Sequence, residues 1–195
     1  LVNLIPRFYE VESGRVLVDG VDVRKLPQEE LRAKIGFVPQ KAVLFTGSVA
    51  DNLRYGKDDA NEEELLHAAQ VAQADGFISG MEAGFGTMLS EGGLNLSGGQ
   101  KQRLAIARAI YVFDDSFSAL DFKTDAKLRA ALRKETGNAT VIIVAQRVGS
   151  VMNADRIIVL DEGSVAGIGT HRELLRTCKV YREIVSSQLS QEEMA

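Results

Sequence analysis

Two runs made up almost entirely of aliphatic residues constrain the fold of this chain more than any other feature of its sequence. The runs are Val141–Val144 and Arg156–Leu160, and β-branched side chains dominate both. Strands that are apolar on both faces are typical of parallel sheets that helices cover on both sides. The sequence therefore predicts an α/β fold with a mostly parallel sheet, in which helices fill the intervals between the strands.

Shorter strand signals occur near the start of the chain. Gly14–Gly20 is predicted to be a strand closed by an Asp-Gly turn. The apolar run Ile35–Val38 is predicted to be a second short strand, which Pro39 ends. Both fit the alternation of strands and helices that an α/β fold requires.

Two helices are predicted from their capping residues. Asn61 can cap a helical stretch that extends to Ile78, and the glutamates that follow Asn61 favour the positive end of the helix dipole. A further helix is predicted over Thr124–Arg133, after Asp121, with Gly137 as its stop signal. The first stretch lies between the early strands and a glycine-rich loop, as an inserted helical subdomain would.

The composition is that of an ordinary globular protein. The 195 residues are 45% hydrophobic and 26% charged, which suffices for one domain or for one domain with a subdomain. A formal net charge of -4 gives no general attraction to nucleic acid. Cys178 is the single cysteine, so no internal disulfide can form, and a reducing compartment is expected.

The 195 residues contain no predicted membrane span and no predicted signal peptide. No apolar run approaches the roughly 20 residues that cross a bilayer, and the first residues lack the flanks of a signal peptide. Any link to a membrane is therefore expected through another segment or another chain. Residues 186–195 are predicted to be a polar tail that frays.

The sharpest local signal is the turn Leu96–Gln100, which runs directly into the strong helix former Lys101–Ala109. The glycines Gly98 and Gly99 let backbone N–H groups approach an anion, and a helix N-terminus adds partial positive charge. Phosphate binding is one interpretation of this turn. The alternative is a cap at Ser97 followed by flexible glycines, and local physics does not decide between the two.

An apolar strand that ends in two carboxylates, Tyr111–Asp115, is the second chemical signal. Ligands in open α/β sheets bind beyond the carboxyl ends of the strands, where a hard carboxylate can hold Mg²⁺. The alternative for such an acidic pair is a solvated turn. Asp161–Gly163, after the last strand, is predicted to be a turn of that kind.

The segments around the glycine-rich turn resemble, in their order along the chain, the motifs of ATP-binding cassette (ABC) proteins of the exporter type. The turn itself resembles the signature motif. The other matches are the Q-loop at Ile35–Gln40, the exporter segment after it at Leu44–Leu53, Walker B at Tyr111–Asp115 and the D-loop at Ser118–Asp121. The resemblance covers nearly all of residues 1–195, and it implies a P-loop NTPase-like core with an inserted helical subdomain at about residues 53–109.

The resemblance also implies ATP and Mg²⁺ as cofactors and assigns roles to individual residues. Asp114 and Gln40 are the implied ligands of Mg²⁺. Gln40, Asp115 and Gln146 occupy the positions tied to hydrolysis, and Asp121 belongs to the D-loop that meets the nucleotide. In this view the domain is an ABC-type transport ATPase.

Cassettes of this family pair head to tail, so that each ATP lies between the Walker motifs of one chain and the signature of the other. The residues implied to complete a partner's site are Ser97, Gly98, Gly99 and Gln100. Glu91 stands where exporters carry a glutamate that contacts the coupling helices of the membrane domain. Membrane domains are therefore expected upstream, contacted near Gln40 and Glu91, with this domain on the cytoplasmic face of a cell membrane. The transported substrate is expected to bind elsewhere.

Two positions depart from the family pattern. Asp115 stands where a glutamate polarises the attacking water, and its carboxylate lies one methylene nearer the backbone. Misplacement by about 1 Å can cost about 10²-fold in rate. Gln146 stands where a switch histidine is usual, and an amide cannot hold a proton as an imidazole can. His171 matches a helix start and His67 is predicted to be a surface residue, so neither takes the place of the switch histidine.

These departures resemble the degenerate subunit of a heterodimeric exporter, which binds ATP and hydrolyses it slowly at its own site. One alternative is a slow homodimer that tolerates both variants. Another is a nucleotide-gated interaction module without hydrolysis, and a third is a soluble cassette that works on DNA or ribosomes. Leu44–Leu53 and Glu91 argue against the third, because both resemble exporter features.

The P-loop pattern is missing from the 195 residues. Leu1–Tyr9 resembles the helix that immediately follows the P-loop in exporters, so we expect the P-loop to precede Leu1. A second omission is expected between Ile110 and Tyr111, because the signature helix runs into the Walker B strand without a loop.

Overall fold

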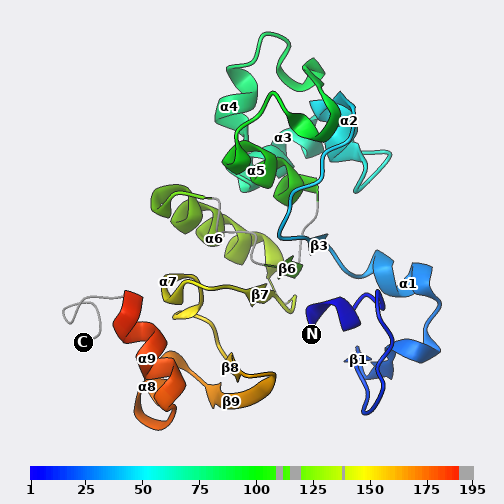
Figure 1. Ribbon diagram of the computed structural model, residues 1–195. Coiled ribbons are helices and arrows are strands. Elements are labelled where there is room, and N and C mark those ends of the chain that lie inside the picture. Colours follow the sequence, from blue (N-terminus) through cyan, green and yellow to red (C-terminus); the bar gives the residue numbers. More distant parts are fainter. Residues whose placement is uncertain (109–111, 115–119, 138, 189–195) are drawn as a thin grey trace. The chain divides into compact units, whose positions relative to one another are not determined.

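The computed structural model describes residues 1–108, 112–114, 120–137 and 139–188. The chain divides into two compact units, Leu1–Ile142 and Ile143–Ala195. Figure 1 shows the helices and strands of both units. The described residues combine helices with short strands, so the predicted mixed α/β class is confirmed.

The first unit begins with a small antiparallel ribbon. Its elements are η1 (Val2–Leu4), β1 (Leu17–Val18), β2 (Val21–Asp22), η2 (Val23–Lys25) and α1 (Gln28–Ala33). Asp19 and Gly20 join β1 to β2 with φ values of 52° and 79°, and positive φ at both central residues is the geometry of a type I′ hairpin turn. The predicted Asp-Gly turn is confirmed, although the strand before it is shorter than Gly14–Gly20.

The expected helix over Leu1–Tyr9 is wrong for most of that segment. Helical structure is limited to the 3-10 turn η1. Arg7 has a φ of 54°, outside the right-handed helical region, and Pro6 has no backbone N–H to donate. The helix therefore cannot extend through these residues.

Two pairs of strands join segments of the first unit that are far apart in the sequence. β3 (Phe37–Val38) pairs in parallel with β6 (Val112–Asp114), with Phe37 opposite Val112 and Val38 opposite Phe113. β4 (Gly47–Ser48) pairs with β5 (Met88–Leu89) in antiparallel fashion. The pair β1–β2 and the hairpin of the second unit are also antiparallel, so a mostly parallel sheet stays a prediction.

The helices between these strands gather in one group (Figure 1). They are α2 (Val49–Arg54), α3 (Glu62–Val71), α4 (Asp75–Ser79) and α5 (Gly98–Arg108), with the short turns η3 (Gly84–Gly86) and η4 (Glu91–Gly93). α5 packs against α2 and α3. Each of these helices carries buried aliphatic side chains, among them Leu53, Leu65, Leu104 and Ile106. α2 begins before residue 53, the predicted start of the subdomain.

The predicted helix after Asn61 is confirmed at its start and divided near its end. The Asn61 side chain accepts from the backbone N–H of Glu64, and the Glu64 carboxylate accepts from the backbone N–H of Asn61. This reciprocal pair is a capping box. At Gln73 the chain takes a φ of 56°, which separates α3 from α4 before the predicted end at Ile78.

α6 (Phe122–Thr136) also follows its predicted cap. The Asp121 side chain accepts from the backbone N–H of Thr124, and Gly137 ends the helix with a φ of 48°. The helix is longer than the predicted range Thr124–Arg133. His67 on α3 is exposed, as predicted, and its Nε2 lies 3.0 Å from the Glu135 carboxylate on α6.

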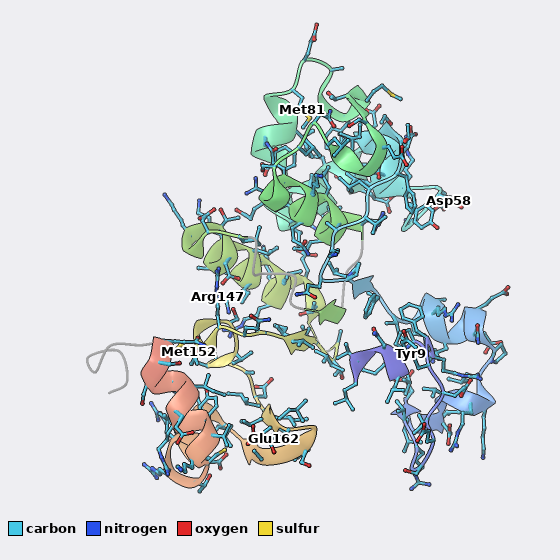
Figure 2. All side chains as sticks on the ribbon, in the orientation of Figure 1. Tyr9, Asp58, Met81, Arg147, Met152 and Glu162 are labelled. Atoms are coloured by element: carbon cyan, nitrogen blue, oxygen red, sulfur yellow. The ribbon has the colours of Figure 1, made fainter. Side chains whose placement is uncertain are left out.

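The second unit contains a β-hairpin covered by helices (Figure 1). Its elements are β8 (Ile157–Asp161), β9 (Ser164–Gly169), α7 (Val148–Val151), α8 (His171–Thr177) and α9 (Lys179–Gln188), and β7 (Ile142–Val144) lies at the junction of the two units. Glu162 and Gly163 form the hairpin turn with positive φ values, and Figure 2 labels Glu162 there. The predicted turn at Asp161–Gly163 is confirmed.

The prediction that Arg156–Leu160 is buried on both faces in a parallel sheet is wrong. β8 pairs with β9 in antiparallel fashion, and its burial alternates. Ile158 and Leu160 are each 52% exposed, whereas Ile157 and Val159 are buried. Only one face of the hairpin meets a helical layer, so the strand needs apolar side chains on that face alone.

The core of the second unit joins α7, the hairpin and both C-terminal helices. Its buried members are Val148, Ile157, Val159, Leu174, Cys178, Tyr181 and Val185. α8 begins at His171, as predicted, under a capping box between Thr170 and Glu173. The helix α9 continues to Gln188, so the predicted fraying tail is helical over its first residues, and 189–195 lie outside the described residues.

Candidate functional site

The glycine-rich turn is the N-terminus of α5. The Ser97 Oγ accepts from the backbone N–H of Gln100 at 3.3 Å, and the Gln100 side-chain oxygen accepts from the backbone N–H of Ser97 at 2.9 Å. The predicted serine cap is therefore present. Because the capping bond uses only a lone pair of Oγ, the Ser97 hydroxyl keeps its capacity to donate a hydrogen bond.

The approach to this turn is open on the side of Gly98. A Cβ built at Gly98 meets no atom within 4 Å, and Gly98 is exposed. The first N–H groups of a helix have no partner within the helix and carry partial positive charge. The cap and the anion-binding interpretation are thus compatible, since the cap shapes the turn and the following N–H groups stay available.

The parallel pair β3–β6 brings two predicted metal ligands to one edge. Asp114 is the last residue of β6, and Gln40 follows β3 by two residues. Since the two strands are parallel neighbours, both residues come at carboxyl ends that meet at the same edge of the sheet. Asp115, together with Ser118 and Ala119 of the predicted D-loop, lies outside the described residues.

Asp121 is the N-cap of α6. Its carboxylate accepts from the backbone N–H of Thr124 at 2.9 Å and from the Thr124 hydroxyl at 2.7 Å. These hydrogen bonds lower the pKa of the Asp121 carboxyl group below its ordinary value. The contact of this residue with nucleotide stays a prediction.

Gln146 belongs to the second unit, where it lies between β7 and α7 with its side chain exposed. Its backbone carbonyl accepts from Nε2 of Gln188 at 2.8 Å.

The first unit brings together two features that the sequence predicted separately, the Leu44–Leu53 segment and Glu91. β4 in the segment pairs with β5, and Glu91 follows β5 at the start of η4. Gly93 has a φ of 63° and is buried, and a Cβ there would lie 2.9 Å from Cδ1 of Leu44. The exposed Glu91 thus follows the strand that pairs with the exporter segment, and the positive φ of Gly93 favours glycine at the position that packs on Leu44.

Asn52 holds the exporter segment in shape, although nothing in the sequence pattern singled it out. It is 2% exposed. Its Oδ1 accepts from the backbone N–H of Phe45 at 2.8 Å, and its Nδ2 donates to the carbonyls of Phe45 and Ser48 at 2.9 and 3.1 Å. An asparagine inside a helical run, where it is a poor helix former, is the signal that could have identified it.

We expect Asn52→Ala to lower the free energy of unfolding by about 2–3 kcal/mol, because it leaves buried backbone groups of the segment without partners. Urea denaturation followed by circular dichroism measures the loss. Asn95→Ala is the matched control, since Asn95 is exposed and makes longer bonds, at 3.2–3.3 Å, to Ser90 and Met88. Equal losses in the two variants would contradict this account of Asn52.

Sequence reasoning also missed an aromatic contact at the far end of the signature helix. The guanidinium of Arg108 lies 5.4 Å from the ring centroid of Phe45 and 5.6 Å from that of Tyr55. The two rings are 4.7 Å apart, and both are exposed. α5 therefore connects the glycine-rich turn at one end with the exporter segment at the other.

A cavity of about 1020 Å³ opens elsewhere in the first unit. Its walls come mainly from Arg32–Phe37, α3 and Arg108. None of the predicted site residues is among its described lining residues, so we do not assign the nucleotide chemistry to it.

The described part of the chain gives two further observations. None of its helices combines the length and the apolar character of a membrane crossing. Within the same ranges, His, Cys, Asp and Glu side chains form no group of three or more that could hold a metal ion.

Comparison with known proteins decides which family contains this serine-capped helix. A family profile described as ABC transporter matches residues 1–117, more than half of the chain. The chain belongs to the ABC transporter family. An uncharacterised ABC transporter ATP-binding protein of Mycobacterium bovis is 52% identical, over 96% of this chain and 34% of the relative. An ATP-dependent lipid A-core flippase of Chromobacterium violaceum is 42% identical, over 98% of this chain and 34% of the relative.

The structural comparison agrees with the sequence comparison. A bacterial Atm1-family ABC exporter with ATP bound superposes with a TM-score of 0.93 and 38% sequence identity, over 97% of this chain and 35% of that structure. The fold is therefore that of an ABC ATPase, a P-loop NTPase fold, and the matched region is an ATP-binding domain of exporter type. The chain spans about a third of the length of these relatives.

Proposed function

We propose that this domain powers an ABC exporter by ATP-driven pairing with a second ABC subunit. The observation that carries the proposal is the open, serine-capped N-terminus of α5 in a chain of this family. A phosphate at that turn accepts from backbone N–H groups and from the Ser97 hydroxyl. Because these contacts form only when the two subunits close on the nucleotide, ATP stabilises the closed state over the open one.

The remaining signature residues support the same interpretation. Gly98 and Gly99 present backbone N–H groups without an intervening side chain. Gln100 orients Ser97 through the reciprocal capping bond. In the proposed head-to-tail pair these residues complete the partner's ATP site, while the partner's signature completes the site of this chain.

The edge of the β3–β6 pair fits Mg²⁺, which accompanies ATP in the proposed function. Asp114 supplies a hard carboxylate and Gln40 an amide oxygen, the ligand types that Mg²⁺ prefers. When bound, the ion neutralises charge on the phosphates. Gln40, Asp115 and Gln146 are the residues of this chain that we propose to act around the nucleotide, and Asp121 is the proposed D-loop contact.

The surface formed by the Leu44–Leu53 segment and Glu91 is the proposed contact with the membrane domain. Gly93 against Leu44 holds the two features together, and Arg108 joins them to the signature helix. α5 therefore offers a rigid connection between nucleotide and membrane domain. We place the domain on the cytoplasmic face of a cell membrane, with the transported substrate bound outside it.

Within this function we propose that the chain's own site is degenerate and that its partner is a different ABC subunit. Asp115 is too short for a glutamate's position and Gln146 cannot take up a proton. Hydrolysis then occurs mainly at the partner's site, which the intact signature of this chain completes. A slow homodimer is the alternative, and it predicts equal hydrolysis at both sites.

The proposal is tested by reconstituting the complete transporter subunit in liposomes with and without an equal amount of its partner. We expect ATP hydrolysis to rise about tenfold or more over the sum of the separate subunits, since neither alone has a complete site. Mg²⁺-dependent phosphate release measures the rate. A rate of ATP hydrolysis no higher than the sum of the two separate rates would favour the non-hydrolysing interaction module. Failure of the domain to copurify with a membrane subunit would favour a soluble cassette.

A further inference from the structure

The side chain of Gln188, at the end of α9, bridges the backbone of the loop that carries Gln146. Its Oε1 accepts from the backbone N–H of Val148 at 2.9 Å, and its Nε2 donates to the backbone carbonyl of Gln146 at 2.8 Å. All three residues belong to the second unit. A single carboxamide thus uses its donor and its acceptor on the two sides of Arg147.

The loop needs such a partner because of the way α7 begins. Arg147 is the N-cap of α7 in an extended conformation, with φ -96° and ψ 126°, and its side chain makes no capping bond. The N–H of Val148 is one of the first N–H groups of a helix, which have no partner inside it. Gln188 supplies the acceptor that a capping side chain supplies elsewhere. Figure 2 labels Arg147 at the start of α7 and Met152 just past its end.

Packing of α9 fixes where Gln188 lies. Tyr181 and Val185 are four residues apart on one face of α9 and are 3% and 0% exposed, and both belong to the core cluster that includes Val148. Gln188 follows Val185 by three residues, so it lies on the same face of the helix. The bridge therefore forms where α9 already packs against α7.

We propose that Gln188 is a positioning residue for the nucleotide site, which acts by fixing the backbone on both sides of Arg147 and hence the direction of the Gln146 side chain. The bridge restrains the rotations between residues 146 and 148, and a restrained backbone fixes the Cα–Cβ direction of Gln146. The inference rests on the proposed function, in which Gln146 acts around the nucleotide, and it takes the side-chain amide of Gln146 to donate a hydrogen bond to the γ-phosphate of ATP. It adds that the C-terminal helix holds this contact in place.

The test uses the complete transporter assembled with its partner and compares ATP with ADP, because only ATP carries the γ-phosphate. Photolabelling of this polypeptide with 8-azido-ATP and 8-azido-ADP measures the two half-saturating concentrations. We expect Gln188→Ala to raise the half-saturating concentration of the ATP analogue about fivefold, in line with loss of about one hydrogen bond. The half-saturating concentration of the ADP analogue should stay unchanged. General unfolding would raise both. Ser187→Ala is the matched control, since Ser187 bonds only within α9, to the Ile184 carbonyl at 2.7 Å, among its described contacts.

Hydrogen exchange of single amides measures directly whether the Gln188 bridge is formed. Gln188→Ala should speed exchange of the Val148 amide about tenfold, while the Val159 amide in the β8–β9 hairpin keeps its protection and shows that the unit is folded. Gln188→Glu keeps an acceptor for Val148 but has no donor for the Gln146 carbonyl. It should therefore leave Val148 protected and still weaken binding of the ATP analogue.

Combination with Gln146→Ala separates this inference from the proposed function. Gln146→Ala alone should reproduce the ATP-selective loss, and adding Gln188→Ala should weaken binding no further, because both changes remove the same contact. If the two losses multiply, Gln188 does not act through Gln146 and the inference is overturned. If Gln146→Ala alone changes nothing, the proposed role of Gln146 fails and the inference fails with it. Unchanged ATP binding in Gln188→Ala, with faster Val148 exchange, would overturn the inference alone.

Discussion

Gly98→Glu is expected to reduce ATP-driven pairing of the two subunits by about 100-fold or more while the domain stays folded. The new side chain has room in the isolated domain, because a Cβ at Gly98 meets no atom within 4 Å. In the closed pair it occupies the path of the phosphate and adds a negative charge beside it. In enzymes, loss of a single preorganised donor to a developing anion lowers kcat by about 10²–10³-fold. Gly98→Glu blocks several donors at once.

The change in Gly98 has a matched control in the same group of helices. Gly76 is an exposed glycine of α4, and a Cβ there also meets no atom within 4 Å. Gly76→Glu therefore adds the same side chain to a helix that is remote from the signature turn in sequence, and pairing should persist. Crosslinking of the two subunits as a function of ATP concentration measures pairing. Pairing that survives Gly98→Glu would remove the basis for placing a phosphate at this turn.

Asp115→Glu combined with Gln146→His should raise ATP turnover at the site of this chain by about 10²-fold. The first change moves the carboxylate outward by one methylene, toward the position of a general base, and the second introduces a group that can hold a proton. General acid–base catalysis typically contributes 10²–10⁴-fold, and a base misplaced by about 1 Å can lose about 10²-fold. Each single change is expected to restore only part of this factor.

The measurement is steady-state phosphate release by the assembled transporter in which the partner's site has been inactivated. Asp161→Glu is the control, because Asp161 is also an aspartate at the carboxyl end of a strand, but that strand is β8, and Asp161 comes directly before the β8–β9 hairpin turn. It should leave turnover unchanged. No increase from the double change would count against a degenerate site and in favour of a chain that hydrolyses ATP slowly for another reason.

The sequence predicted those parts of the fold that rest on contacts between near neighbours. The caps at Asn61 and Asp121 bond to residues three positions away, so the pattern of side chains is enough to identify them. The Asp19-Gly20 turn is equally local. The serine cap of α5 belongs to the same class, and the sequence predicted it as one of two interpretations of the glycine-rich turn.

The sequence was less informative where pairing partners are distant. An apolar strand such as Arg156–Leu160 fits a parallel sheet as well as one half of a hairpin, because composition does not say which partner pairs with it. The Glu162-Gly163 turn joins β8 to β9 as an antiparallel hairpin. The sequence predicted this turn, but it did not predict that the strand before the turn would pair with the residues after it.

By itself, the sequence of this ABC protein determined the helix caps, the tight turns, the signature helix and the two departures at Asp115 and Gln146. Only the tertiary structure placed Glu91 beside the exporter segment, through Gly93 packed on Leu44. It alone joined Gln188 to the loop of Gln146, across more than 40 residues of chain. The physical reason is that local hydrogen bonds are specified by the spacing of a few residues, whereas contacts between remote segments depend on how the whole core packs.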